Sequence, residues 1–195
     1  MSQAAIPIDN KVAALMRAGS TAFANADVDV GEGLQGEWPP AGDHDLYILG
    51  VTEKVGDYKD GDLKVPCVEV QFEFEWIRDP NDPTWDKVKD PGPLHFKGRS
   101  FRLVPNPDKD LVSDGAKTGA RMDWERFKGH LTKILGITKD QCADPMARYA
   151  EVKGLIAGST RVAVSAKLNY REWTSKDGKK KGVEKKEYIT GNITG

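Results

Sequence analysis

The sequence has few of the side chains that build metal centres or disulfide frameworks. Cys67 and Cys142 are its only cysteines, neither lies in a CxxC pattern, and its three histidines are far apart along the chain. We therefore expect neither a zinc site nor a disulfide framework. The start of the chain has no signal-peptide pattern, and no apolar run approaches the length of a membrane span. These absences favour a protein of a reducing cytoplasm that does not contact a membrane.

The usual short motifs of catalysis are also absent. The sequence contains no GxGxxG, GxxxxGK[ST], GxSxG or HExxH pattern. Glu151 and Lys153 have the local spacing of a metal-dependent nuclease, but they lie in a helical stretch, and no matching aspartate precedes them on a clear strand. We therefore expect a protein that is not an enzyme and that needs no cofactor.

Charge is nearly balanced over the whole chain but not along it. The 29 basic and 30 acidic residues give a formal net charge of −1. Residues 1–60 contain four basic and ten acidic residues, a local charge of −6, whereas residues 161–188 contain nine basic and four acidic residues, a local charge of +5. A directional field of this kind would attract a polyanion to the C-terminal region.

The chain divides near residue 42. Residues 1–41 hold one short amphipathic helix candidate, "NKVAALMRAG", followed by a small, acidic and glycine-rich run. We expect these residues to form a flexible acidic N-terminal arm with a short helix. Residues 42–195 are then one domain, since their length and hydrophobic content suit a single core.

Three strands are expected first in this domain. Residues 44–55 form one candidate, and "CVEVQFEFEWI" is the clearest, because its valines, phenylalanines and tryptophan alternate strictly with polar residues. Residues 56–64 contain a DG pair and are expected to form a loop. "LHFKGRSFRLVP" forms the third strand, with a bulge at Gly98.

A helix and a long hairpin complete the pattern. The helix is expected to start after Asp123 and to end at Gly136, and Pro145 suits the first position of a further short helix. "STRVAVSAKLNYREW" and "GVEKKEYITGNI" then form the two last strands.

The order of three strands, a helix and two strands predicts a mainly β protein with one or two helices, folded as a five-stranded OB-fold-like barrel. A β-sandwich with an inserted helix and an α+β domain with a flat sheet are the alternatives.

The fourth strand carries the strongest functional pattern. Alternate residues from Val162 to Tyr170 form an apolar face, and the opposite face is rich in cations and small residues and ends in Trp173. Cations bind phosphates, and an exposed aromatic ring offers a base a stacking surface. A solvated sheet face is the alternative for any one of these side chains. The combined face and the lysine-rich tip that follows it favour a polyanion site.

Other parts of an OB-like barrel would join this site. The loop between the first two strands borders the same groove as the loop between the last two, and it carries Tyr58 and Lys59. Cations of the third strand could follow the nucleic-acid backbone or could be ordinary surface charge. Trp85, in a proline-rich loop, is either a stacking platform or a plug. The candidate nucleic-acid-binding residues are Tyr58, Lys59, Lys97, Arg99, Arg102, Arg161, Lys167, Arg171, Trp173, Lys179, Lys180 and Lys181.

The chain also resembles a known family in its segments "PPAGDHDLYILGVTEKV", "CVEVQFEFEW", "LTKILGI" and the last two strands. Together these segments are similar to a phage-encoded family of small OB-fold single-stranded-DNA-binding-like proteins, over roughly residues 38–193. The resemblance implies binding of single-stranded DNA during replication, recombination or repair, in a bacterial or phage-infected cell, with no cofactor. It differs from many such proteins in ending with the neutral "TGNITG" in place of an acidic tail.

The sequence therefore predicts a single-stranded DNA-binding protein with little sequence preference. RNA is an alternative ligand, and replication or recombination proteins and further copies of the chain are candidate partners. The alternative function is a non-enzymatic phage structural, assembly or protein-docking module. In that case the N-terminal arm, residues 1–41, would become ordered on assembly.

Overall fold

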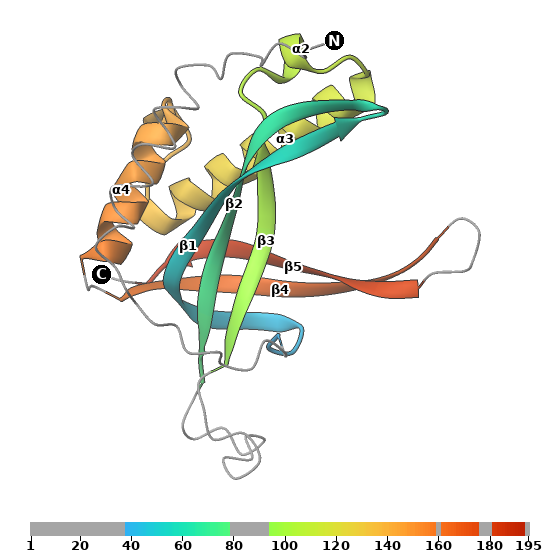
Figure 1. The fold of residues 1–195 in the computed structure, drawn as a ribbon. Helices are drawn as coiled ribbons and strands as arrows, with labels where there is room; N and C mark the ends of the chain where they lie inside the picture. Colours follow the sequence, from blue (N-terminus) through green and yellow to red (C-terminus); the bar gives the residue numbers. More distant parts are fainter. Residues whose placement is uncertain (1–37, 79–93, 159–160, 176–180, 194–195) are drawn as a thin grey trace.

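The computed structural model describes residues 38–78, 94–158, 161–175 and 181–193. The expected N-terminal arm, with its short helix, falls mostly on residues 1–37 and so lies outside the described residues, as does Trp85. The fold is mainly β, as the sequence predicts, with five antiparallel strands in one sheet (Figure 1).

The strands follow one another in the sheet in the order β3-β2-β1-β4-β5. Their bounds are Gly42–Asp60 for β1, Leu63–Ile77 for β2, His95–Leu103 for β3, Val162–Thr174 for β4 and Lys181–Asn192 for β5. The first strand is long enough to pair with β2 from Asp45 to Asp60 and with β4 through its first seven residues. Consequently β1 joins strands β2 and β3, on one side of it in the sheet, to the β4–β5 hairpin on the other side.

The alternation of β2 is confirmed, because Val68, Val70, Phe72 and Phe74 are buried in the core. In β1 the simple alternation fails at a bulge between Ile48 and Gly50. The bulge shifts the phase by one residue, so Leu46, Ile48 and then Val51 face the core. The expected bulge at Gly98 is confirmed, because two residues of β3, Gly98 and Arg99, stand against the single residue Phe72 of β2 between the pairs Gln71–Ser100 and Glu73–Lys97.

The expected loop at residues 56–64 is instead mostly strand. The two strands continue to Asp60 and Leu63, which pair with each other, and only Gly61 and Asp62 form the turn. Gly61 has a φ of 63°, which favours glycine at that position. The DG turn signal was therefore right, but the hairpin is longer than the sequence predicted.

The sequence predicted one or two helices, whereas three α-helices and a short 3-10 helix lie between β3 and β4 in the described residues: α2 (Pro107–Asp110), α3 (Asp114–Leu135), η1 (Asp140–Cys142) and α4 (Pro145–Ala157). The prediction that the main helix starts after Asp123 is wrong, because Ser113 caps α3 and accepts a hydrogen bond from the Ala116 amide. The predicted helix end is confirmed at Gly136, which is left-handed with a φ of 65°. Pro145 begins α4 as expected.

The core lies between the sheet and α3. Phe127, Leu131 and Ile134 of α3 are completely buried and belong to one apolar cluster with Phe72 and Phe101 of the sheet. Helix α4 is attached to β1 by an ion pair between Lys153 Nζ and Glu53 Oε1, 2.9 Å apart, in which both side chains are largely buried. Among the described helices, none combines the length and apolar character that a membrane span requires.

A buried carboxylate connects the two edge strands of the sheet, β3 and β5. Glu187 of β5 has no exposed surface, and its two oxygens accept hydrogen bonds from the Arg99 amide of β3 at 2.8 and 2.9 Å. The Nε2 atom of His130, on α3, lies 3.7 Å from Glu187 Oε1. Within the described residues no backbone ladder joins β3 to β5, so the closed barrel stays a prediction.

Candidate nucleic-acid interface

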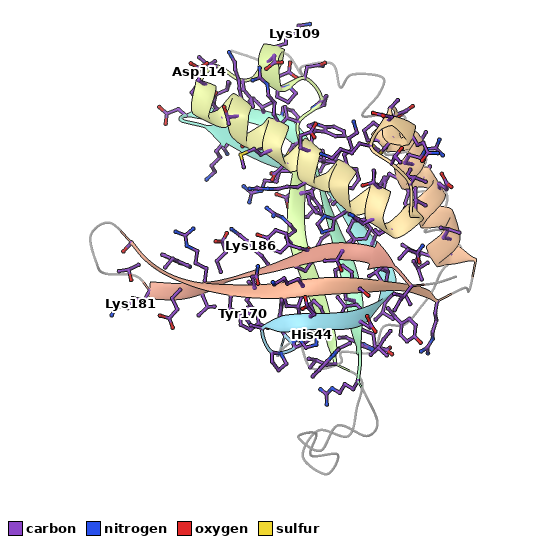
Figure 2. The ribbon with its side chains drawn as sticks, turned by 180° about the vertical axis from the view of Figure 1, so that it is seen from behind. His44, Lys109, Asp114, Tyr170, Lys181 and Lys186 are labelled. Carbon is purple, nitrogen blue, oxygen red and sulfur yellow. The ribbon has the colours of Figure 1, made fainter. Side chains whose placement is uncertain are left out.

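Beyond Leu168, the last two strands leave the rest of the sheet. Leu168 is the last residue of β4 to pair with β1, whereas β4 and β5 remain paired as far as Thr174 and Lys181. We call this two-stranded extension, residues 169–175 and 181–186, the arm. It projects from the molecule to the same side as the β1–β2 hairpin (Figure 1). Lys181 lies at its outer end, and Tyr170 lies near its base beside His44 (Figure 2).

One face of the arm gathers cations and aromatic rings from both strands. The pairing puts Lys167 opposite Tyr188, Arg171 opposite Glu184, and Trp173 opposite Gly182. Directly opposed residues of an antiparallel pair point to the same side, so these side chains share one face. We call it the cationic face; its members are Lys167, Asn169, Arg171, Trp173, Gly182, Glu184, Lys186 and Tyr188.

The cationic face is open to solvent. Trp173 is 44% exposed and Tyr188 is 42% exposed, and Lys167 and Arg171 are exposed as well. Lys186 forms an ion pair with Glu184 at 3.0 Å, and this contact is the main reason why the pKa of Glu184 is lowered. Within the described residues, Lys167 and Arg171 form no ion pair, although Asp43 of β1 lies opposite Lys167 and Glu184 lies opposite Arg171. A phosphate would therefore compete with solvent and with these two carboxylates for the cations. Lys181 forms no ion pair either, but it lies opposite Thr174 and so belongs to the other face of the arm.

The other face of the arm is braced by the start of the described chain. The Tyr170 hydroxyl donates a hydrogen bond to the Pro39 carbonyl, and the rings of Tyr170 and Trp38 lie 6.4 Å apart. Lys185 Nζ lies 5.7 Å from the Tyr170 ring centroid and 6.0 Å from that of Trp38. Tyr170 therefore follows the apolar face of β4, as predicted, but packs at the rim of the core, where 36% of it stays exposed.

Three of the predicted phosphate-binding cations instead pair with the glutamates of β2. Lys97 Nζ lies 3.4 Å from Glu73, Arg102 Nε lies 3.1 Å from Glu69, and Arg161 Nη1 lies 3.7 Å from Glu75. Glu69 also pairs with Lys54, and the hydrogen bond from Lys54 is the main cause of its lowered pKa. Single exposed ion pairs are weak, but the glutamates would repel a phosphate brought to these cations.

Arg99 is held in the seam between β3 and α3. Its guanidinium Nη2 lies 3.9 Å from Asp123 Oδ1 and its Cζ lies 5.5 Å from the centroid of the Phe101 ring. Only 16% of the side chain is exposed. Its surroundings therefore favour a role in packing over contact with a ligand.

The β1–β2 hairpin tip packs against the start of α3. The Tyr58 hydroxyl donates a hydrogen bond to the Ala116 carbonyl at 3.4 Å, and its ring packs on a small cluster that includes Val65 and Leu111. Burial is the main reason why the pKa of Tyr58 is raised. Lys59 is exposed beside it. Because the Tyr58 ring is half-buried, it offers less surface to a base than Trp173 does.

Asp60 fixes this tip to the loop before α3. Its carboxylate accepts hydrogen bonds from the Val112 amide at 2.6 Å, the Ser113 amide at 2.9 Å and the Ser113 hydroxyl at 2.5 Å. These bonds, with that of the Ser113 side chain as the largest cause, hold the pKa of Asp60 below its usual value.

We expect acid to release the tip. Because the folded-state pKa of Asp60 is lowered, its stabilising contribution is complete above the unfolded value of about 3.9 and is lost as the pH falls through the folded value. The protection factors of the Val112 and Ser113 amides, which correct for the intrinsic exchange rate at each pH, should therefore fall below about pH 4, and Asp60→Ala should lower them already at pH 6. The Leu111 amide, which donates to the Pro107 carbonyl, is the internal control. Equal protection of all three amides at pH 3 and pH 6 would contradict this assignment.

The described candidate residues thus fall into three groups. The first group lies on the arm or at its base and consists of Lys167, Arg171, Trp173 and Lys181. The second lies near acidic partners and consists of Lys97, Arg99, Arg102 and Arg161. The third, Tyr58 and Lys59, lies at the other hairpin tip. Lys179 and Lys180 are outside the described residues.

Sequence reasoning missed Tyr188 and Lys186 of the cationic face. The signal was present in the sequence, because Asp177-Gly178 is a dipeptide typical of hairpin turns. Counting outward from it puts Lys167 opposite Tyr188, as in the structure.

No protein-family model, curated protein or solved structure matches the chain. In the part of the chain that the structure describes, no three histidine, cysteine or acidic residues are grouped so that they could hold a metal ion. Burial raises the pKa of the Cys67 thiol to about 11, so Cys67 is a poor nucleophile. The exposed cationic face is therefore the feature of the described residues from which we infer a function.

Proposed function

We propose that the protein binds single-stranded DNA on the cationic face of the arm and acts in phage-type DNA replication, recombination or repair. The observation that supports this proposal is the exposed indole of Trp173 on the same face as Lys167 and Arg171, on a ribbon that extends beyond the core. The ligand would be held by phosphate contacts and base stacking, so we expect little sequence preference.

An OB-like barrel is part of the same proposal. In favour of it, β1 pairs with both β2 and β4, the main helix lies between β3 and β4, and the edge strands β3 and β5 approach each other through Glu187. In an OB-fold the hairpin formed by the last two strands borders the oligonucleotide site. The arm is the corresponding hairpin in this chain.

The chemistry of the arm favours an unpaired strand over a duplex. Trp173 can accept a base only on a free flat face, and the bases of a duplex are already stacked on one another. Lys167 and Arg171 lie four residues apart on one strand, a span of about 13 Å, so they would contact different phosphates. Each contact releases counterions and adds to the salt dependence of binding.

Titration of a fluorescent dT oligonucleotide at several salt concentrations tests the proposal. For the unchanged protein, the logarithm of the affinity should fall linearly with the logarithm of the salt concentration. Lys167→Ala and Arg171→Ala should each weaken binding and reduce that slope by about 0.7, the value for one phosphate of a single strand.

A matched control is Lys139→Ala, which removes an exposed lysine from the segment between α3 and η1, far from the arm in Figure 1. This variant should keep both the affinity and the slope. Binding that is undetectable at low salt, or that weakens equally in all three variants, would refute the proposed interface.

A further inference from the structure

Gly182 lies directly under the indole of Trp173, across the arm. A Cβ atom placed on Gly182 would lie 2.9 Å from Cε2, 2.9 Å from Nε1 and 3.0 Å from Cζ2 of Trp173. These three ring atoms are equally distant from that point, so the indole faces the glycine with its flat side. The separation is closer than side-chain carbons tolerate, so the ring occupies space that only a glycine leaves free.

The arrangement leaves part of the indole available to a ligand. Trp173 is 44% exposed although it lies against Gly182, and its strand neighbours on the same face include Arg171. Lys181, next to Gly182 in the chain, is exposed as well, but it lies opposite Thr174 and so points to the other face of the arm. A ring that is held flat on one side by the backbone, with Arg171 on the same face, is preorganised to stack on a second flat group that is attached to a phosphate.

We propose that Gly182 is a positioning residue, which seats Trp173 as a platform for one unpaired nucleobase. This inference rests on the proposed function and deepens it, because it assigns recognition of the base, as distinct from the phosphate, to a single pair of opposed residues. An aromatic ring that covers a glycine also stabilises a hairpin, so the test needs a readout that hairpin stability does not change.

Comparison of two oligomers provides this readout: dT oligonucleotide and an abasic oligonucleotide of equal length, which has the same sugar-phosphate chain without bases. The unchanged protein should prefer the dT oligonucleotide, by about 5-fold to about 150-fold for one stacked base. Gly182→Ala should bring this ratio close to one, because the added methyl group displaces the indole, while the salt slope of binding should stay the same.

The matched control is Gly191→Ala, on the same strand, where an added Cβ would have no neighbour within 4 Å. This variant should keep the full preference for dT. Trp173→Ala should lose the preference to the same extent as Gly182→Ala, and the double variant should lose no more than Trp173→Ala alone, since the glycine acts through the ring.

The outcomes separate this inference from the function on which it rests. If the unchanged protein binds neither oligomer, the proposed function fails. If it binds both equally, phosphate binding stands, but the base stacking of the proposed function fails together with this inference. If Gly182→Ala keeps the preference for dT while Trp173→Ala loses it, the proposed function stands and the positioning role of Gly182 alone is overturned. Circular dichroism and urea unfolding of Gly182→Ala verify that the variant folds, so that a changed ratio reports on the site.

Discussion

Glu187→Ala is expected to destabilise the protein by about 3 kcal/mol or more. The carboxylate is fully buried, and it accepts two hydrogen bonds from the Arg99 amide. It also lies 3.7 Å from His130 Nε2, an atom that is buried and has no hydrogen-bond partner among the described residues. Its removal would leave a cavity at the seam between β3, β5 and α3, would leave the Arg99 amide without its acceptor, and would take away the nearest carboxylate from His130 Nε2.

Urea unfolding of Glu187→Ala and Glu184→Ala side by side measures this effect. Glu184 lies on the same strand, but its side chain is 47% exposed and forms an ion pair only with Lys186 among the described residues, so its removal should shift the urea midpoint far less than removal of Glu187 does. Glu187→Gln keeps an acceptor for the Arg99 amide and should fall between the two. Equal midpoints for Glu187→Ala and Glu184→Ala would show that the seam does not depend on this carboxylate.

The sequence could not identify Glu187, and the reason is physical. In "EKKEY" the glutamate stands among charged residues of an apparently solvated hairpin. Its burial arises because Glu187 lies opposite Leu168, on the core face of the strand, and because β3 approaches β5 in three dimensions. Contacts between residues 88 positions apart are not encoded in local periodicity.

Local patterns predicted the strands better than their limits. The strict alternation of β2 could hardly be anything but a strand with one buried face, whereas the β1–β2 hairpin extends farther than its glycines indicated. The start of α3 was missed because Gly115 and Gly119 resemble loop residues. There the helix is stabilised by tertiary contacts, with Asp60 bonded to Ser113 and Ala120 buried.

The candidate site was predicted only in part, because some of its features are local and others depend on how the strands pair. The cations and the tryptophan of β4 follow from alternation, which is a local property. Pairing of Lys97, Arg102 and Arg161 with the β2 glutamates depends on the register between neighbouring strands, which the sequence alone did not provide. Among the described residues of the predicted site, four cations form no ion pair, namely Lys59, Lys167, Arg171 and Lys181, although Glu184 lies opposite Arg171. Of these four, Lys167 and Arg171 share a face with Trp173.

Gly98→Ala is the second substitution for which we expect a large loss of stability, about 1–3 kcal/mol. A Cβ atom at this position would lie 2.7 Å from Cε2 of Phe74 and 2.8 Å from Oε1 of Glu187. Neither neighbour can move away, because both side chains are fully buried. The methyl group would therefore push the carboxylate away from the Arg99 amide and weaken the connection between β3 and β5. Thermal or urea unfolding measures the loss, and Gly191→Ala, which meets open space, should change stability by less than 1 kcal/mol.

A double-mutant cycle shows whether Gly98 and Glu187 act at one seam. If the strain at Gly98 is exerted on the Glu187 carboxylate, removal of the carboxylate relieves it, and Gly98→Ala in a Glu187→Ala background should cost at least 0.5 kcal/mol less than in the unchanged protein. Strictly additive losses would mean that the methyl group acts on Phe74 alone. Because β5 carries Gly182 and Tyr188 as well as Glu187, a seam that is loosened in this way should also weaken binding of the dT oligonucleotide, whereas Glu184→Ala should not loosen it.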